Sequence, residues 1–354
     1  MNDVLLVGVW DWANTAWRFK RCLEYLGLSV KAFKGHPHKF SYPEEIEIHR
    51  GISRTRSIPD FPIMATVHEL KSWADNSKIV HMFASCLVDV GVDLTQHKTV
   101  VQHSGVTYTL NSEKGNDIFN PIADATIMQF PSLLGRGAVN EHLVIYPVDT
   151  QYIRPNYNRK TDKLIIGHWP SNPDTKGTDK VLRVIEHLES SSVASKFEYV
   201  GIRESRSIVN GRRKYDHTPW VAHLERVRRC DVLIETIQPW VYEGETPGSY
   251  TFIPNGNRQA FGDWGNQALE GAALGKIVIT NSCHSALYQR EYGDCALRVA
   301  NDENELENQL AALIESTPDE ILFLKQRTRA WAERNHSIES TATRLWDQVY
   351  RHLM

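Results

Sequence analysis

The stretch from Gly262 to Asn281 carries residue types that could bind an anionic ligand next to a polyol. A glycine-containing loop leads into a predicted short helix, for which Asn266 is the expected N-cap. Unpaired backbone N–H groups at such a helix start suit phosphate or carboxylate. Glu270 lies about one turn into the helix, where its carboxylate could accept two hydroxyl hydrogen bonds, as a ribose offers. The alternative is that Glu270 is a solvated helix residue and Gly265 only opens a turn.

A second candidate site follows the first predicted strand, Val4–Val9. Trp10, Asp11 and Trp12 lie on the loop beyond its carboxyl end, the edge at which ligands bind in such sheets. Tryptophan faces stack on sugar rings and bases, so either indole could contact such a group, and the alternative for each is a place in the core. Asp11 is the one carboxylate on this loop.

The elements around these residues predict an α/β fold. Val4–Val9, a helix beginning at Asn14 or Thr15, and Val30–Phe33 form a β-α-β unit with parallel strands. Its loop lacks the second and third glycines of a dinucleotide fingerprint, which disfavours a nicotinamide enzyme. The remaining elements expected in the first half are a helix at Thr66–Ala74 and strands at Ile79–Phe83, Thr99–Gln102, Ala125–Gln129 and His142–Tyr146.

The second half repeats this alternation after a turn-rich polar segment, Pro147–Asn158, which is the expected linker. The pattern predicts domains at residues 1–150 and 151–336 and a C-terminal helix at 337–354, each of the two domains holding a doubly wound parallel sheet. The expected strands are Leu164–His168, Phe197–Val200, Val232–Ile237 and Ile277–Ile279, and the expected helices are Asp179–Leu188, Trp220–Arg229, 303–316, 318–334 and 337–353.

Composition agrees with a two-domain protein, because 354 residues exceed the usual size of one domain. The net charge of −3 gives no global case for nucleic-acid or membrane-surface binding. No apolar run approaches the roughly 20 residues of a membrane span, and the N-terminus lacks the pattern of a signal peptide. Five scattered cysteines predict reduced thiols. The expected location is cytoplasmic, with peripheral attachment to a membrane as the alternative.

Five segments, in order, resemble those of GT-B glycosyltransferases, most closely the retaining family 4 (glycosyl transferases group 1). They are Tyr146–Pro155, Ile166–Lys180, Arg229–Glu235, Gly265–Asn281 and Tyr292–Asp302. The resemblance implies two facing Rossmann-like domains with a cleft between them. It also implies that the nucleotide-sugar donor binds mainly to the second domain and the acceptor to the first, where Trp10 or Trp12 would contact the acceptor and Asp11 is the candidate for the base that takes its proton. The last helix would cross back to the first domain.

The resemblance also implies roles for single residues. Lys176 matches the lysine that contacts the donor pyrophosphate, where a cation offsets the charge of the leaving group. Glu270 matches the second glutamate of a paired motif and would hold the ribose hydroxyls. The first glutamate would fall at Gly262 and is missing, while Asp263, one residue out of register, is the nearest carboxylate. That first position contacts the transferred sugar in the family.

Backbone N–H groups of Trp264, Gly265 and Asn266 would approach the donor. His103, at the end of a first-domain strand, matches a histidine that faces the donor sugar, and His81 competes for this role. A structural role is the alternative for both histidines.

The expected function is transfer of a sugar from a UDP- or GDP-sugar to an acceptor hydroxyl, with retention, by an enzyme of the hexosyltransferase class. No Asp-x-Asp motif occurs, so neither a metal nor another cofactor is expected. A non-catalytic nucleotide-sugar binding protein and a nucleotide-sugar epimerase of similar fold are the alternatives. The acceptor stays open among a glycan, a lipid-linked sugar, a protein and a nucleic-acid base.

Overall fold

The computed structural model forms two compact units. The described residues are 2–8, 11–35, 38–47, 68–83, 92–105, 108, 111–157, 161–173, 176–203, 208–209, 212–213, 218–237, 240–241, 260–261, 264–281 and 285–354. The first unit contains Met1–Pro147 and His336–Met354, and the second contains Val148–Glu245 and Ser249–Asn335. The domain limits expected at 150 and 336 stay predictions, because compactness alone does not test independent folding.

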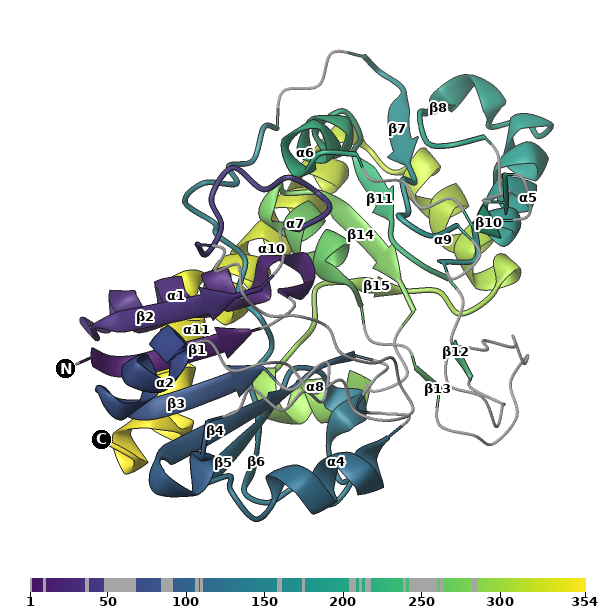
Figure 1. Ribbon diagram of the computed structural model, residues 1–354. Coiled ribbons are helices and arrows are strands. Elements are labelled where there is room, and N and C mark those ends of the chain that lie inside the picture. Colours follow the sequence, from purple (N-terminus) through teal and green to yellow (C-terminus); the bar gives the residue numbers. More distant parts are fainter. Residues whose placement is uncertain are drawn as a thin grey trace. The chain divides into compact units, whose positions relative to one another are not determined.

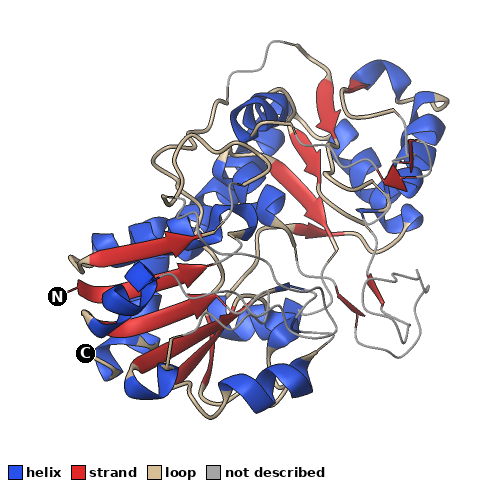
Figure 2. Cartoon of the chain, viewed as in Figure 1, coloured by secondary structure: helices blue, strands red, loops and turns tan. Residues whose placement is uncertain are grey.

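The first unit is built on a parallel sheet with the strand order β2-β1-β3-β4-β5-β6 (Figures 1 and 2). The apolar runs expected from the sequence form its strands, because residues buried on both faces of a parallel sheet are nearly all apolar. The strands are β1 (Asn2–Gly8), β2 (Val30–Lys34), β3 (Ser77–Phe83), β4 (Lys98–His103), β5 (Ala125–Met128) and β6 (Glu141–Leu143).

Helices α1 (Thr15–Tyr25), α2 (His68–Asp75), α4 (Ser112–Phe119) and α11 (Ile338–Gln348) complete the first unit. The C-terminal helix packs against α1, where the Cys22 thiol donates to the carbonyl of Ile338 at 3.4 Å. Just beyond it, the Tyr350 hydroxyl lies 2.7 Å from Nδ1 of His81 on β3. The last residues of the chain therefore belong to the core of the first unit.

The second unit has a parallel sheet with the order β15-β14-β11-β7-β8. Its strands are β7 (Leu164–Gly167), β8 (Phe197–Tyr199), β11 (Val232–Ile234), β14 (Ile277–Thr280) and β15 (Arg298–Val299). Its helices are α5 (Thr178–Glu189), α6 (Trp220–Arg228), α7 (Asn266–Ala273), α8 (Ser285–Tyr292), α9 (Glu303–Glu315) and α10 (Pro318–His336). Two short antiparallel pairs are added, β9 (Ile208–Val209) with β10 (Arg212–Arg213) and β12 (Trp240–Val241) with β13 (Ala260–Phe261).

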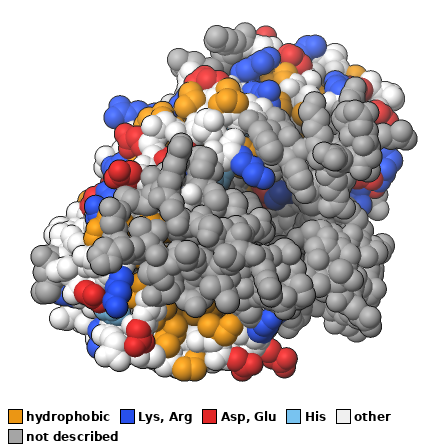
Figure 3. Space-filling model, in the orientation of Figure 1, with side chains coloured by type: hydrophobic (Ala, Val, Ile, Leu, Met, Phe, Trp, Pro, Cys, Tyr) orange, Lys and Arg blue, Asp and Glu red, His pale blue; other side chains and the backbone are white. Residues whose placement is uncertain are grey.

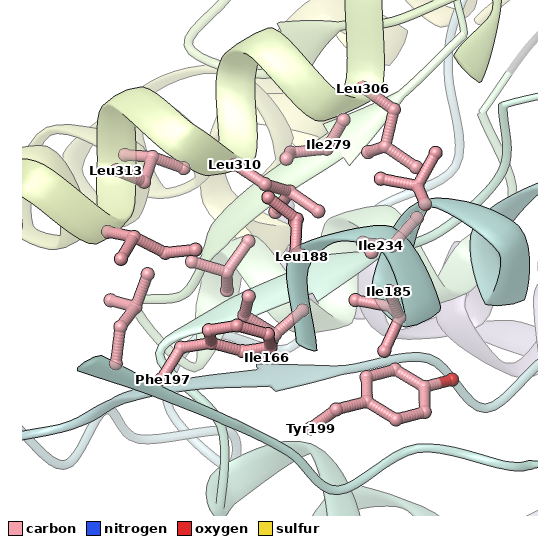
Figure 4. Packing of buried hydrophobic residues seen from close by; sticks show 14 of the residues in the cluster. Ile166, Ile185, Leu188, Phe197, Tyr199, Ile234, Ile279, Leu306, Leu310 and Leu313 are labelled. Atoms are coloured by element: carbon pink, nitrogen blue, oxygen red, sulfur yellow. The ribbon is translucent and has the colours of Figure 1, made fainter. Parts of the chain in front are cut away.

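Figure 4 shows how the core of the second unit is closed on one face of its sheet. Leu310 and Leu313 on α9 meet Ile185 and Leu188 on α5 above strand residues such as Ile166. On the described part of the surface in Figure 3, Lys and Arg side chains lie among Asp and Glu side chains. None of the helices in the described ranges is both long and apolar enough to cross a membrane.

Leu310→Ala should lower the free energy of unfolding by about 2–5 kcal/mol, because Leu310 is fully buried in this cluster and its removal leaves a cavity. The matched control is Leu322→Ala on α10, a leucine that is 36% exposed. Urea denaturation monitored by circular dichroism measures both. Equal losses for the two variants would contradict the packing described for α9.

The order of the second sheet fixes where a ligand can bind. The connection that leaves β7 runs to β8, and the connection that leaves β11 runs to β14 in the opposite direction along the sheet, so the strand order reverses between β7 and β11. A crevice forms at such a switch point, beyond the carboxyl ends of the strands. In the second unit this edge is made by the residues that follow β7, β11 and β14. In the first unit the equivalent point lies between β1 and β3.

Candidate donor site

An ion pair occupies the switch point of the second unit. The Lys176 ammonium, in the loop before α5, contacts Oε1 of Glu235, the first residue after β11. The Glu235 side chain is 1% exposed and that of Lys176 is 21% exposed. The hydroxyl of Thr280 on β14 donates to Oε2 of Glu235 at 2.9 Å. Three separate segments thus converge on one buried carboxylate, and one cation is left partly open to solvent.

The start of α7 completes this cluster. The Gly265 N–H donates to Oε1 of Glu235 at 3.3 Å. A Cβ at position 265 would lie 2.9 Å from the Glu235 carboxylate and 3.4 Å from the Lys176 ammonium, so only glycine lets the backbone approach the pair this closely. Gly265 is the N-cap and α7 begins at Asn266, so the expectation of Asn266 as the N-cap is wrong. Glycine supplies the close approach that an asparagine side chain would block.

Glu270 is buried within α7 instead of being a solvated helix residue. Its Oε1 accepts a hydrogen bond of 2.8 Å from the indole Nε1 of Trp220, the first residue of α6. The Trp220 ring stacks on Tyr152, with ring centroids 5.5 Å apart and planes 23° apart, and Tyr152 is 51% exposed. Glu270 lies four residues after Asn266, which corresponds to a rise of about 6 Å along the helix axis. A carboxylate and a cation therefore flank the start of α7.

The Trp264 side chain belongs to the core. Its ring packs edge-on against Tyr288 and Trp331, at centroid distances of 4.8 and 6.0 Å. What Trp264 can offer a ligand is thus its backbone, as expected from the sequence. Gly262 and Asp263 lie outside the described residues.

His168 follows β7 directly, at the carboxyl edge of the sheet. The imidazole is fully buried, its Nδ1 donates to the Ile234 carbonyl at 2.8 Å, and its Nε2 accepts from the Thr178 hydroxyl at 2.9 Å. Both ring nitrogens are therefore used to tie the ends of β7, β11 and α5 together. His168 positions the site and does not itself supply a cation.

Burial lowers the pKa of His168 from 6.5 to about 4. The unfolded chain binds this proton more readily, so the stability from neutral His168 is complete above pH 6.5 and is lost as the pH falls toward 4. The free energy of unfolding of His168→Gln should therefore fall less steeply over this interval than that of the wild type, by about 1.4 kcal/mol per pH unit. Urea titrations at several pH values measure the slopes, and parallel curves would refute the assignment.

The structure adds two residues to this edge that sequence reasoning missed. The expected strand Val232–Ile237 ends at Ile234, so Glu235 is an edge residue and not part of the strand. Asn281, which follows β14, is buried, and neither polar atom of its side chain has a hydrogen-bond partner among the described residues. Buried side-chain amides are normally hydrogen-bonded, and a ligand bound at this edge would supply partners for the amide of Asn281. Both residues come directly after apolar strands, which is the signal that could have found them.

In the first unit, the Asp11 carboxylate holds the start of α1. Its Oδ1 accepts from the Ala16 N–H at 2.7 Å, and its Oδ2 is buried and has no hydrogen-bond partner within the described ranges. Burial raises the pKa of Asp11 to about 6, although Lys34 and Arg18 act in the opposite direction. Its capping contact is a structural role, and its role as an acceptor base stays a prediction. Trp10 and the side chain of Trp12 lie outside the described residues.

The two candidate histidines of the first unit are both buried. His81 has a partner for each ring nitrogen, since Nε2 lies 3.0 Å from Gln102 Oε1 and Nδ1 bonds Tyr350. His103 ends β4 and its ring stacks on that of Tyr108 at a centroid distance of 3.9 Å. No hydrogen-bond partner of its Nδ1 lies in the described part of the chain. Burial lowers the pKa of both to about 3, so both are neutral. His81 is structural, and the role of His103 toward a donor sugar stays a prediction.

The chain is similar to known proteins in structure and not in sequence. No protein-family model matches the chain, and no curated protein is significantly similar to it in sequence. Solved structures are similar over whole chains. Sucrose-phosphate synthase from Thermosynechococcus elongatus has a TM-score of 0.58 at 13% identity, covering 100% of this chain and 99% of that one. Anabaena HepE, in complex with UDP and glucose, has a TM-score of 0.56 at 11% identity and 99% coverage of both chains.

A third similar structure is AviGT4, a glycosyltransferase involved in avilamycin A biosynthesis, with a TM-score of 0.53 at 14% identity and coverage of 100% and 98%. Full coverage in both directions means that both parallel-sheet units have counterparts in these proteins. The chain has the GT-B fold. The expected fold class is confirmed, and within it the ion pair of Lys176 and Glu235 lies in the second unit, at the carboxyl edge of the sheet.

Proposed function

We propose that this protein is a glycosyltransferase that takes a sugar from a UDP-sugar, bound at the switch point of the second unit. The observation that carries the proposal is the convergence of Lys176, Glu235 and the N–H of Gly265 at the start of α7. A cation and helix-start amides are the groups that stabilise charge on a departing diphosphate. The similar structures support the choice of nucleotide, because HepE is known in complex with UDP and with UDP-glucose.

We assign the roles within the site by distance along α7. Lys176 and the amides of Gly265 and Asn266 face the diphosphate. Glu270, one turn further along the helix, accepts the ribose hydroxyls, and Trp220 orients its carboxylate through the indole N–H. The exposed face of Tyr152 beside Trp220 offers a surface on which a base can stack.

Glu235 supplies a carboxylate beside the loop in which the paired motif lacks its first glutamate. It accepts a hydrogen bond from the N–H of Gly265, and Gly265 lies three residues after Gly262 in the sequence. In the proposed site, Glu235 holds Lys176 until the diphosphate attracts that ammonium. The unpartnered amide of Asn281 then contacts the donor sugar. We further propose that transfer proceeds with retention, as in family 4, and without a metal, since the sequence has no Asp-x-Asp motif.

The test is turnover of a panel of UDP- and GDP-sugars without an added acceptor, followed by mass spectrometry. A transferase slowly releases nucleoside diphosphate from its donor, because water replaces the acceptor. A binding protein with a degenerate site releases none, and an epimerase converts the sugar without releasing nucleotide. Release of UDP that survives EDTA supports the proposal, and absence of any diphosphate release across the panel contradicts it.

A further inference from the structure

A second concave region lies at the opposite edge of the same sheet. A cavity of about 380 Å³ is lined by Ile165 on β7, by Asp231 and Lys276, which directly precede β11 and β14, and by Lys325 on α10. The other lining residues are Asn156, Thr161, Glu225, Arg228, Arg229 and Cys230. Asp231 directly precedes β11 and Glu235 directly follows it. At about 3.3 Å per residue, the four steps between them place this cavity roughly 13 Å from the ion pair at the carboxyl edge.

The lining is rich in cations. Four cationic side chains and two carboxylates line the cavity, so its described lining carries a formal charge of +2. The cations are Arg228, Arg229, Lys276 and Lys325, and the carboxylates are Glu225 and Asp231. Both carboxylates are already engaged. Asp231 accepts from the Lys325 ammonium at 2.8 Å and from the Ile165 N–H at 3.1 Å, and Glu225 is paired with Arg228. The surplus positive charge therefore has no counter-charge among the described residues that line the cavity.

Lys276 is the most unusual member of this lining. It is 1% exposed, and its ammonium donates to the backbone carbonyl of Arg228 at 3.0 Å. No carboxylate of the described chain lies within ion-pair distance of it. Burial lowers its pKa, with Lys325 adding to the effect. A buried ammonium without an anionic partner is costly, and an anion in the cavity would offset that cost.

We propose that this cavity is a binding site for a small phosphate monoester, separate from the donor site. A phosphate monoester carries a charge of about −1.5 to −2 at neutral pH, which matches the surplus of the lining. The volume lies at the lower end of the range for small-ligand pockets. Arg229, which is exposed at the rim, offers a planar fork for phosphate oxygens, and Asn156 and Thr161 offer polar groups for the remainder of the molecule.

The test is calorimetric titration of the full chain with glycerol 3-phosphate, and separately with inorganic phosphate, at constant ionic strength set with chloride. Arg229→Gln, at an exposed position, should weaken binding about tenfold or more, since it removes a charge-assisted hydrogen bond. Lys276→Met keeps the length and apolar stem of the side chain and should abolish binding, with circular dichroism confirming the fold. Lys176→Met tests whether the anion binds at the donor site instead. Lys180→Met, which removes one lysine of α5, is the control and should bind the anion as the wild type does.

Each outcome decides a point. Tighter binding of the ester than of inorganic phosphate assigns the site to a phosphorylated small molecule, and equal binding assigns it to free phosphate. If Lys176→Met loses phosphate binding while Arg229→Gln retains it, the anion occupies the donor site and the proposal fails. Absence of binding to the wild type overturns it as well. The result is independent of the proposed transferase activity, because no donor is present.

Discussion

Lys176→Met is expected to slow turnover of the nucleotide-sugar donor about 10²- to 10³-fold, as loss of a preorganised charge-stabilising group does in other enzymes. The lysine is the cation that the switch point presents, and methionine keeps its length without its charge. Release of UDP from the preferred donor measures the effect. Lys180→Met, on the neighbouring turn of α5, is the matched control and should turn over the donor at the wild-type rate.

Lys176→Met should also lower the free energy of unfolding, so a second variant is needed to separate the loss of turnover from the loss of stability. Glu235 is 1% exposed, and without Lys176 its carboxylate is buried without a cation, at a cost of about 3–5 kcal/mol. Glu235→Gln removes that charge, so the double variant Lys176→Met/Glu235→Gln should regain most of the stability but not the turnover. If turnover returns together with stability, Lys176 acts only through the fold and its role toward the diphosphate is wrong.

Glu270→Gln should remove the preference for a ribose over a 2′-deoxyribose. A carboxylate forms hydrogen bonds with hydroxyl groups worth about 1.5–3 kcal/mol, so the wild type should bind UDP at least about tenfold more tightly than 2′-deoxy-UDP. Glutamine keeps the shape of Glu270 and can still accept from Trp220. The variant should bind the two nucleotides with similar, weaker affinities.

Glu186→Gln, an exposed residue on α5, is the control for the loss of one carboxylate in this unit. It should keep the wild-type preference for UDP. If Glu270→Gln discriminates against the deoxynucleotide as strongly as the wild type does, the ribose does not contact Glu270, and the orientation proposed for the nucleotide along α7 is reversed or wrong.

The strands of both sheets could be predicted because burial on two faces leaves a continuous apolar run, as in β1 and β14. The end of α7 was also predictable, since Gly275, at φ +66°, takes just beyond the helix a left-handed conformation that favours glycine. The N-cap of α7 was not predictable in this way. The prediction relied on the capping preference of Asn266, whereas the close approach of Glu235 favours a glycine, Gly265, at the cap.

The polar partners could not be predicted, because each pair joins residues far apart in the chain. Fifty residues separate Trp220 from Glu270, and 59 separate Lys176 from Glu235. Hydrophobic periodicity reports which face of an element is buried and not which side chain it meets. His168 shows the same limit, since its two ring partners come from β11 and α5. The cationic cavity at the amino edge is formed by residues from several elements and has no motif in the sequence.

The most direct test of the central claim, a nucleotide-binding site at the switch point of the second unit, is calorimetric titration of UDP and of GDP. The wild type, Lys176→Met/Glu235→Gln and Glu270→Gln would be compared under one set of conditions. The account predicts that the wild type binds UDP and that both variants bind it at least about tenfold more weakly. Equal affinities in all three proteins, or no binding of either nucleotide by the wild type, would contradict it.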